Sequence, residues 1–216
     1  MSELILNNAK APVANFVFAH GAGAGKKHSF MEKMATLLVE QGINVIRFDF
    51  PYMAKRAIDG KKYPPNKMPV LVEAYQAILT DIGTELPLFI GGKSMGSRVA
   101  MTLLGEDEHM SERVTGAICL GYPFHPPKKP EKHRLAPLMV NRVPTLICQG
   151  DRDTLGNKPE IDSYLLAAHY QLMFLPDGDH DFKPRVRSGY NQEQHLVSVA
   201  QAIRGFVEQV AGQGAK

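Results

Sequence analysis

One serine has a setting that suits nucleophilic chemistry. Ser94 is the centre of the pentapeptide GKSMG at 92–96, which follows an apolar run at 86–90 and precedes a segment of helical composition. A sharp strand-to-helix turn strains the backbone at such a serine, and small residues two positions before and after it make room for the turn. Gly92 and Gly96 occupy both positions. Because the turn also presents the hydroxyl at a helix N-terminus, which favours developing negative charge, we interpret Ser94 as a nucleophile for acyl transfer rather than an incidental serine.

The partners that such a serine needs are a general base and a carboxylate that orients the base. Of the eight histidines, only His180 combines a place directly after the final predicted strand with a place before the last predicted helix. Asp153 lies on the loop that leaves an earlier strand, and Asp151, which is nearer to that strand, is the alternative acid. We therefore predict that Ser94, Asp153 and His180 are the catalytic residues, in that chain order.

A glycine-rich segment, HGAGAG at 20–25, follows the first long strand. Small residues let a backbone approach a substrate oxygen closely, so we expect the N–H groups of Ala22 and Met95 to form an oxyanion hole. His20 is expected to brace this segment. A phosphate-binding loop is the alternative, but the spacing of the glycines and the places of His20 and Lys27 fit neither a dinucleotide fingerprint nor a P-loop.

The elements that must position these residues alternate between strands and helices. Apolar strands are predicted at residues 3–6, 12–19, 43–48, 86–90, 114–120, 144–149 and 171–175. Helices are predicted at residues 29–41, 69–82, 99–104 and 161–168 and from 191 onwards. Near-continuous apolar strands are typical of an α/β fold with a mostly parallel, doubly wound sheet and helices on both faces. Right-handed crossovers put the C-terminal ends of parallel strands on one edge, which would bring the glycine-rich segment and the three catalytic candidates together.

The composition fits one globular domain over residues 1–216, since 44% of the residues are hydrophobic and 22% are charged. The formal net charge of +3 is too small to indicate a nucleic-acid partner. No signal-peptide pattern or apolar run of membrane-spanning length is present, so a cytoplasmic location is expected. Cys119 and Cys148 lie inside apolar runs and are interpreted as buried, reduced thiols. The acidic cluster at 177–181 lacks the spacing of metal ligands, so no metal is expected.

These motifs together resemble the α/β-hydrolase superfamily. The resemblance is carried by His20-Gly21, GKSMG at 92–96, GDRD at 150–153 and GDH at 178–180, and it extends over nearly the whole chain. Within the superfamily, the sequence resembles a small lidless branch with a lysine before the nucleophile, similar to dienelactone-hydrolase-like and testis-expressed hydrolase-like proteins. The resemblance implies a serine hydrolase that cleaves esters, thioesters or related acyl bonds without a cofactor. It does not identify the substrate, because such folds support many activities. We expect this hydrolase to be a monomer or homodimer.

Lys93, directly before the serine, departs from the usual pattern of hydrolases. We favour a structural cation that meets a carboxylate over a catalytic role for this lysine. Some relatives keep the fold and act only as protein partners. The alternative function is therefore a catalytically silent module that binds an acidic partner through its basic rim, although an intact set of serine, aspartate and histidine speaks against it.

The loops expected around the site are basic. Residues 53–69 are expected to form a long loop, and residues 121–142 are proline-rich and too few for a lid domain, so the site should be open. The basic residues of these loops and their neighbours are Lys26, Lys27, Lys55, Arg56, Lys61, Lys62, Lys67, Lys128, Lys129, Lys132, Arg134, Arg142, Lys183, Arg185 and Arg187, against which stand only Asp59 and Glu131. Two interpretations stay open: the rim steers an anionic acyl substrate towards the site, or the lysines merely keep the loops solvated. The candidate residues beside the substrate are His20, Tyr52, Arg56 and Lys93.

Overall fold

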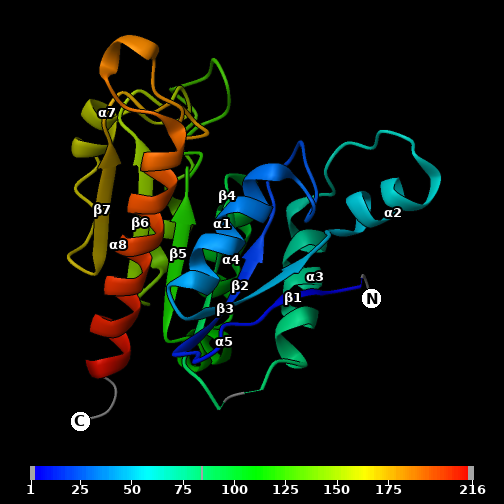
Figure 1. The fold of residues 1–216 in the computed structure, drawn as a ribbon. Helices are drawn as coiled ribbons and strands as arrows, with labels where there is room; N and C mark the ends of the chain where they lie inside the picture. The colour runs from blue at the N-terminus through cyan, green and yellow to red at the C-terminus, as the bar shows by residue number, and fades with distance from the viewer. Residues whose placement is uncertain (1–2, 84, 214–216) are drawn as a thin grey trace.

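The computed structural model describes residues 3–83 and 85–213 and has a twisted seven-stranded sheet at its centre (Figure 1). The strands are β1 (Ile5–Asn7), β2 (Ala14–Ala19), β3 (Ile43–Phe48), β4 (Leu88–Lys93), β5 (Gly116–Leu120), β6 (Thr145–Gly150) and β7 (Tyr170–Leu175). Their order is β1-β3-β2-β4-β5-β6-β7, and only the edge pair β1–β3 is antiparallel. The predicted fold class is confirmed.

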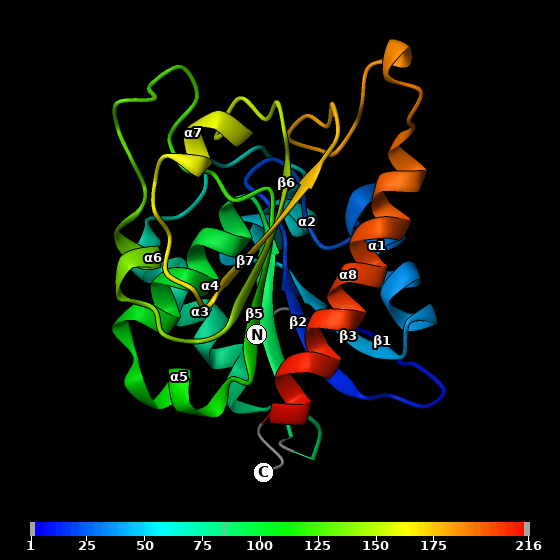
Figure 2. The same cartoon turned by 90° about the vertical axis from the view of Figure 1, so that its left-hand side faces the viewer.

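Helices cover both faces of the sheet, as Figure 2 shows. They are α1 (Ser29–Glu40), α2 (Pro51–Asp59), α3 (Met68–Thr80), α4 (Met95–Glu106), α5 (Glu108–Arg113), α6 (Ala136–Val140), α7 (Lys158–Asp162) and α8 (Gln192–Gln213), with a short 3₁₀ helix η1 (Val186–Ser188). The α1 and α8 helices lie together on one face, and α3, α4 and α6 lie on the other. Among the described residues, no helix is long and apolar enough to cross a bilayer.

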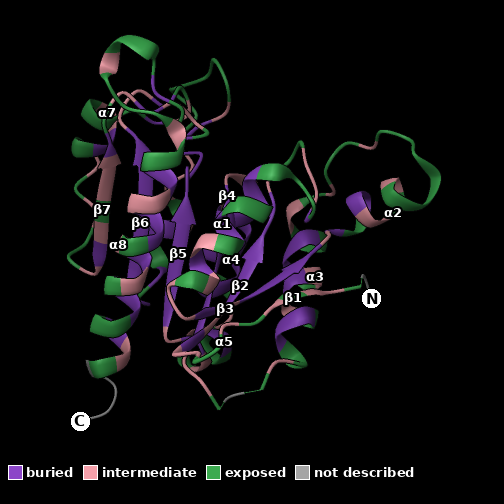
Figure 3. Ribbon diagram, in the orientation of Figure 1, coloured by how far each residue is buried: buried purple, intermediate pink, exposed green. Residues whose placement is uncertain are grey.

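The alternation of side chains along each central strand builds two cores, one under each helical layer. In β2, Phe16 and Phe18 lie in the core beneath α1 and α8, whereas Val17 and Ala19 lie in the core beneath α3 and α4. Each fully buried phenylalanine contributes roughly 1.5–3 kcal/mol to folding. Consequently β4, β5 and β6 are buried along their whole length, and β2 is buried except at Asn15 (Figure 3).

The strand that carries the serine is held from both sides. A Cβ atom on Gly91 would overlap the carbonyl oxygen of Ile118 on β5, so only glycine fits there. On the other side, the buried Tyr75 hydroxyl of α3 accepts a hydrogen bond from Gly91 N at 2.8 Å and lies 2.6 Å from Val17 O of β2. These contacts fix the backbone just before the nucleophile candidate.

The prediction of a loop over residues 53–69 was wrong, because its first part is helical. The α2 helix has a proline, Pro51, in its first turn and ends at Asp59, and Gly60 caps it with a φ of 71°. Tyr52 and Met53 are buried, while most of the remaining helix is exposed. Because most of this helix is exposed and partly basic, its composition resembles that of a loop, and a helix was not predicted. Residues 60–67 have no regular structure.

The prediction of a helix over residues 161–168 was also wrong. Asn157 caps α7 through its side chain, and the helix ends at Asp162 with Ser163 as its C-cap. Leu165 then has a φ of 48° and is exposed, so the chain cannot continue as a helix. The sequence missed α5 and α6, and it placed the start of α4 late, at 99 instead of Met95.

Candidate active site

The serine lies on a strained elbow between β4 and α4. Ser94 has a φ of 53° and a ψ of −113°, a conformation that ordinary residues rarely adopt. A Cβ atom on Gly92 or on Gly96 would lie 2.5 Å from the carbonyl oxygen of Ala19. Both glycines are therefore required by the close approach of β2 to the turn. The main chain is anchored as well, since Ser94 N donates to Leu120 O at 2.9 Å.

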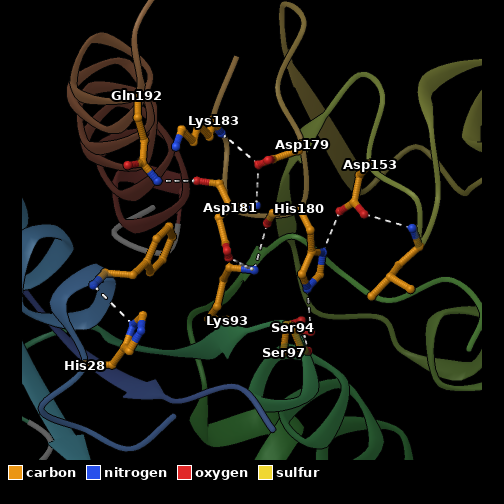
Figure 4. Close-up of polar contacts among 12 residues, drawn as sticks. His28, Lys93, Ser94, Ser97, Asp153, Asp179, His180, Asp181, Lys183 and Gln192 are labelled. Carbon is orange, nitrogen blue, oxygen red and sulfur yellow. Dashed lines mark hydrogen bonds and ion pairs between the residues drawn. The ribbon is translucent and has the colours of Figure 1, made fainter. Parts of the chain in front are cut away.

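The three catalytic candidates form a continuous line of hydrogen bonds (Figure 4). Ser94 Oγ lies 2.8 Å from His180 Nε2, and His180 Nδ1 lies 2.7 Å from Asp153 Oδ2. With its Nδ1–H donating to the carboxylate, the imidazole presents the Nε2 lone pair to the hydroxyl. The alternative acid, Asp151, lies outside this line; its main chain pairs with Leu175 and Lys158.

A residue that the sequence analysis missed holds the carboxylate. Gln149 is fully buried, and its Nε2 donates to Asp153 Oδ2 at 2.9 Å and faces Gly156 O at 3.0 Å and Tyr122 O at 3.3 Å. The other carboxylate oxygen accepts from Leu155 N at 2.8 Å. A polar residue at the end of the otherwise apolar β6 was the available signal for Gln149.

The glycine-rich segment is braced from behind. His20 is fully buried; its Nδ1 donates to Gly21 O at 2.7 Å and its Nε2 accepts from Phe50 N at 3.0 Å. Burial lowers the pKa of His20, which suits this neutral, accepting form. The Tyr52 hydroxyl donates to Ala22 O at 2.9 Å. Two of the residues expected beside the substrate, His20 and Tyr52, therefore support the loop.

A cleft of about 370 Å³ opens in front of the serine. Its lining residues are Gly21, Ala22, Gly23, Ala24, His28, Phe30, Met31, Lys93, Ser94, His180 and Asp181. Ala22 is thus at the cleft, as the oxyanion-hole prediction requires. Met95 is the first residue of α4, and its N–H has no acceptor within the helix. Arg56 lines a neighbouring hollow of about 480 Å³ together with Lys27.

The two cysteines are poor competitors for the role of nucleophile. Both thiols are free and buried. Burial raises the pKa of both, that of Cys148 to about 12, so little thiolate forms at neutral pH. No group of three or more possible metal ligands was found among residues 3–83 and 85–213.

A comparison with known protein families shows to which family this chain belongs. The profile described as "Alpha/beta hydrolase domain" matches residues 12–208. The chain belongs to the α/β hydrolase family. The predicted superfamily is thereby confirmed.

Solved structures with the same fold include several hydrolases. Dienelactone hydrolase from Anabaena variabilis is 20% identical, with a TM-score of 0.70 over 96% of this chain and 91% of that chain. Est1E from Butyrivibrio proteoclasticus, with ferulic acid bound, is 13% identical, with a TM-score of 0.69 over 97% and 95%. A serine hydrolase without a lid from Xanthomonas campestris is 15% identical, with a TM-score of 0.64 over 97% and 88%. At these identities the likeness concerns the fold alone.

The basic rim of this α/β hydrolase is less extensive than its sequence suggests. Lys26 is buried and forms an ion pair with Asp49 at 3.6 Å. Arg185 forms a hydrogen-bonded ion pair with Asp177, and this contact lowers the pKa of the Asp177 carboxyl to about 2. Arg142 lies three residues before the first residue of β6 and is therefore at the opposite edge of the sheet from the cleft. These three residues do not contribute free positive charge beside the serine.

Proposed function

We propose that this α/β hydrolase is a serine hydrolase that cleaves a carboxylic ester, a thioester or a related acyl bond. The observation that carries the proposal is the unbroken line of hydrogen bonds from Ser94 Oγ through His180 to the buried Asp153. The strained elbow gives further support, because backbone strain at a reactive residue is a recurrent feature of active sites. The fold shared with an esterase domain and with dienelactone hydrolase is consistent with acyl-bond hydrolysis.

The first half of the reaction transfers the acyl group to the enzyme. Ser94 Oγ attacks the substrate carbonyl carbon while its proton moves to His180 Nε2. The carbonyl oxygen becomes an oxyanion, and Asp153 stabilises the imidazolium through Nδ1–H. When the tetrahedral intermediate collapses, the bond to the leaving group breaks and Nε2–H protonates that group. An acyl-serine and a free alcohol or thiol are formed.

The second half regenerates the serine. His180 Nε2 removes a proton from water, whose oxygen attacks the acyl carbon. A second tetrahedral oxyanion forms and collapses, the bond to Ser94 Oγ breaks, and Nε2–H returns its proton to that oxygen. The products are the free acid and the enzyme in its starting state.

The oxyanion of both halves would be bound by the N–H groups of Ala22 and Met95. The Ala22 loop is held by His20 and Tyr52, and the Met95 N–H lies at the N-terminus of α4. Such fixed donors need no reorganisation when the charge develops, and one of them typically contributes about 10²–10³ in kcat.

The cleft fits a compact acyl substrate. Its wall beside the serine consists of small residues, 21–24, and the segment 121–142 carries only the short α6 helix and no lid. Inside the cleft the carboxylate of Asp181 pairs with the ammonium of Lys93 at 3.2 Å, so this pair adds little net charge next to the reacting carbon. Any steering of an anionic substrate would therefore act through the outer loops, and a fall of kcat/KM with added salt for anionic but not neutral esters would test it.

The proposal is tested with a fluorophosphonate probe, which modifies activated serines. We expect labelling of wild type at Ser94, found by peptide mapping, and no labelling of Ser94→Ala. We also expect Ser94→Ala to lose about 10⁶-fold in ester turnover while it stays folded. Ser198→Ala, at a half-buried serine of α8, is the matched control and should behave as wild type. Unchanged turnover in pure Ser94→Ala, or labelling only at another residue, would refute the proposal.

A further inference from the structure

The lysine next to the nucleophile is buried, and its contacts lie on the histidine side of the site. Lys93 ends β4 and is 7% exposed. A buried ammonium costs several kcal/mol unless it is paired and hydrogen-bonded. Burial lowers the pKa of Lys93, while the nearby carboxylates, Asp181 first among them, act in the opposite direction.

The ammonium joins the nucleophile strand to the histidine loop (Figure 4). Lys93 Nζ donates to the main-chain carbonyl of His180 at 2.8 Å and lies 3.2 Å from Asp181 Oδ1. The Phe30 ring of α1 completes the surroundings, with its centroid 5.5 Å from Nζ. One side chain therefore contacts the residue that carries the imidazole and the residue after it.

The ammonium also lies close to the imidazole itself. A Cβ atom built on Gly121 would be 3.2 Å from Lys93 Nζ and 3.4 Å from His180 Cε1. Both groups thus border the same small space above the end of β5. The charge on Lys93 consequently acts on the imidazole as well as on its backbone.

We propose that Lys93 is a positioning residue, whose ammonium fixes the main chain of His180 so that the imidazole stays between Ser94 and Asp153, and that Asp181 balances this charge beside the ring. The inference depends on the proposed serine hydrolase activity. It explains why a lysine is buried one residue before the nucleophile, with a carboxylate partner that is itself 64% exposed.

The charges around the imidazole determine in which direction the pH dependence of kcat/KM should move in each variant. They come from Asp153, whose carboxylate faces Nδ1, and from the ion pair of Lys93 and Asp181, while Asp179 on the same loop acts on the ammonium of Lys93. Removing the ammonium leaves the carboxylates, which favour the imidazolium. The acid limb of the pH profile of kcat/KM should therefore move to higher pH. Removing the carboxylate of Asp181 leaves the ammonium, so that limb should move to lower pH.

The experiment compares Lys93→Met and Asp181→Asn with wild type on p-nitrophenyl acetate, a small neutral ester. We expect Lys93→Met to lose on the order of 10²-fold in kcat with little change in KM, since a misplaced base costs about that much. The acid limbs of the two variants should move in opposite directions. Lys158→Met is the matched control, because Lys158 also pairs with a carboxylate, Asp162 at 2.7 Å, but is half-exposed and has its ammonium over the ring of Phe174 on β7.

A merely structural role for the lysine would reduce the active fraction, measured by fluorophosphonate titration, without moving the acid limb. Lys93→Met with the kcat and pH profile of wild type overturns the inference. If Lys93→Met does not fold, Asp181→Asn decides, and an acid limb identical to that of wild type overturns the inference. A wild type that hydrolyses no ester and takes up no probe instead refutes the proposed function, and the role of Lys93 with it.

Discussion

Gln149 Nε2 lies 2.9 Å from Asp153 Oδ2, the carboxylate oxygen that also faces the imidazole of His180. The two side chains come from β6 and from the loop that leaves it, and both are fully buried. The amide thereby holds the carboxylate and, through it, the orientation of the ring. A residue that never meets the substrate is thus part of the support of the proposed catalytic line.

Replacing Gln149 by leucine removes the donor and leaves the carbonyls of Gly156 and Tyr122 without this partner. We expect Gln149→Leu to lose about 1–3 kcal/mol of unfolding free energy and to lower kcat on a neutral ester. Gln149→Glu places a second carboxylate beside Asp153, so its loss of stability should be larger at pH 7 than at pH 5. Urea unfolding at both pH values measures this.

The matched controls are Gln201→Leu and Gln201→Glu, at an exposed position of α8. Both should remain within about 0.5 kcal/mol of wild type at either pH. A Gln149→Glu protein whose stability has the same pH dependence as wild type would show that the amide does not interact with Asp153 in solution.

The sequence was sufficient for the sheet and for the convergence of Ser94, Asp153 and His180, because parallel topology brings strand ends to one edge. The residues that hold these three side chains in place could not be predicted from the sequence. Gln149 meets Tyr122 and Lys93 meets His180 across 27 and 87 positions of the chain, and no local pattern identifies such distant partners. The catalytic roles themselves stay predictions until the serine is labelled.

The backbone strain at Ser94 predicts that glycine at this position gives a more stable protein than alanine does. Ser94 has a φ of 53°, and a non-glycine residue in such a conformation costs about 1–3 kcal/mol. Ser94→Gly and Ser94→Ala both lose the hydroxyl, but only glycine relieves the strain. We expect Ser94→Gly to be the more stable by about 1 kcal/mol, after the larger unfolded-state entropy of glycine is subtracted. Urea unfolding of the two inactive proteins measures the difference.

The same pair of substitutions at Ser198, within α8, should give the opposite order, because glycine in a helix interior is about 1 kcal/mol less favourable than alanine. If Ser94→Ala proved more stable than Ser94→Gly, the backbone at the elbow would be unstrained in solution.

The contact of Tyr75 with Gly91 predicts that removal of the tyrosine hydroxyl lowers the stability of the fold but not the catalytic rate. Tyr75→Phe removes the buried oxygen that accepts from Gly91 N, so this N–H group loses that acceptor inside the core. We expect a loss of about 1–3 kcal/mol of unfolding free energy, with kcat of the folded fraction close to wild type. Tyr190→Phe, at a half-exposed tyrosine, should be neutral. Equal stability of the two variants would contradict the assigned hydrogen bond.

The buried His20 predicts how the fold responds to mild acid. Burial lowers its pKa below the usual 6.5, whereas in the unfolded chain it keeps that value. Below about pH 6.5 the unfolded state therefore takes up a proton that the folded state refuses. This contribution to stability is complete above pH 6.5 and is lost as the pH falls towards the folded-state pKa, with a limiting slope of about 1.4 kcal/mol per pH unit.

We expect His20→Gln to be less stable than wild type at pH 7 but to have a shallower fall in unfolding free energy between pH 7 and pH 5. Burial also lowers the pKa of His169, so part of the slope should remain. His109→Gln, at an exposed histidine of α5, should keep the wild-type slope. Because His20 accepts from Phe50 N while it braces the glycine-rich segment, the protonation that weakens the fold also weakens the support of the proposed oxyanion hole. A His20→Gln slope equal to that of wild type would mean that His20 is not held neutral by the fold.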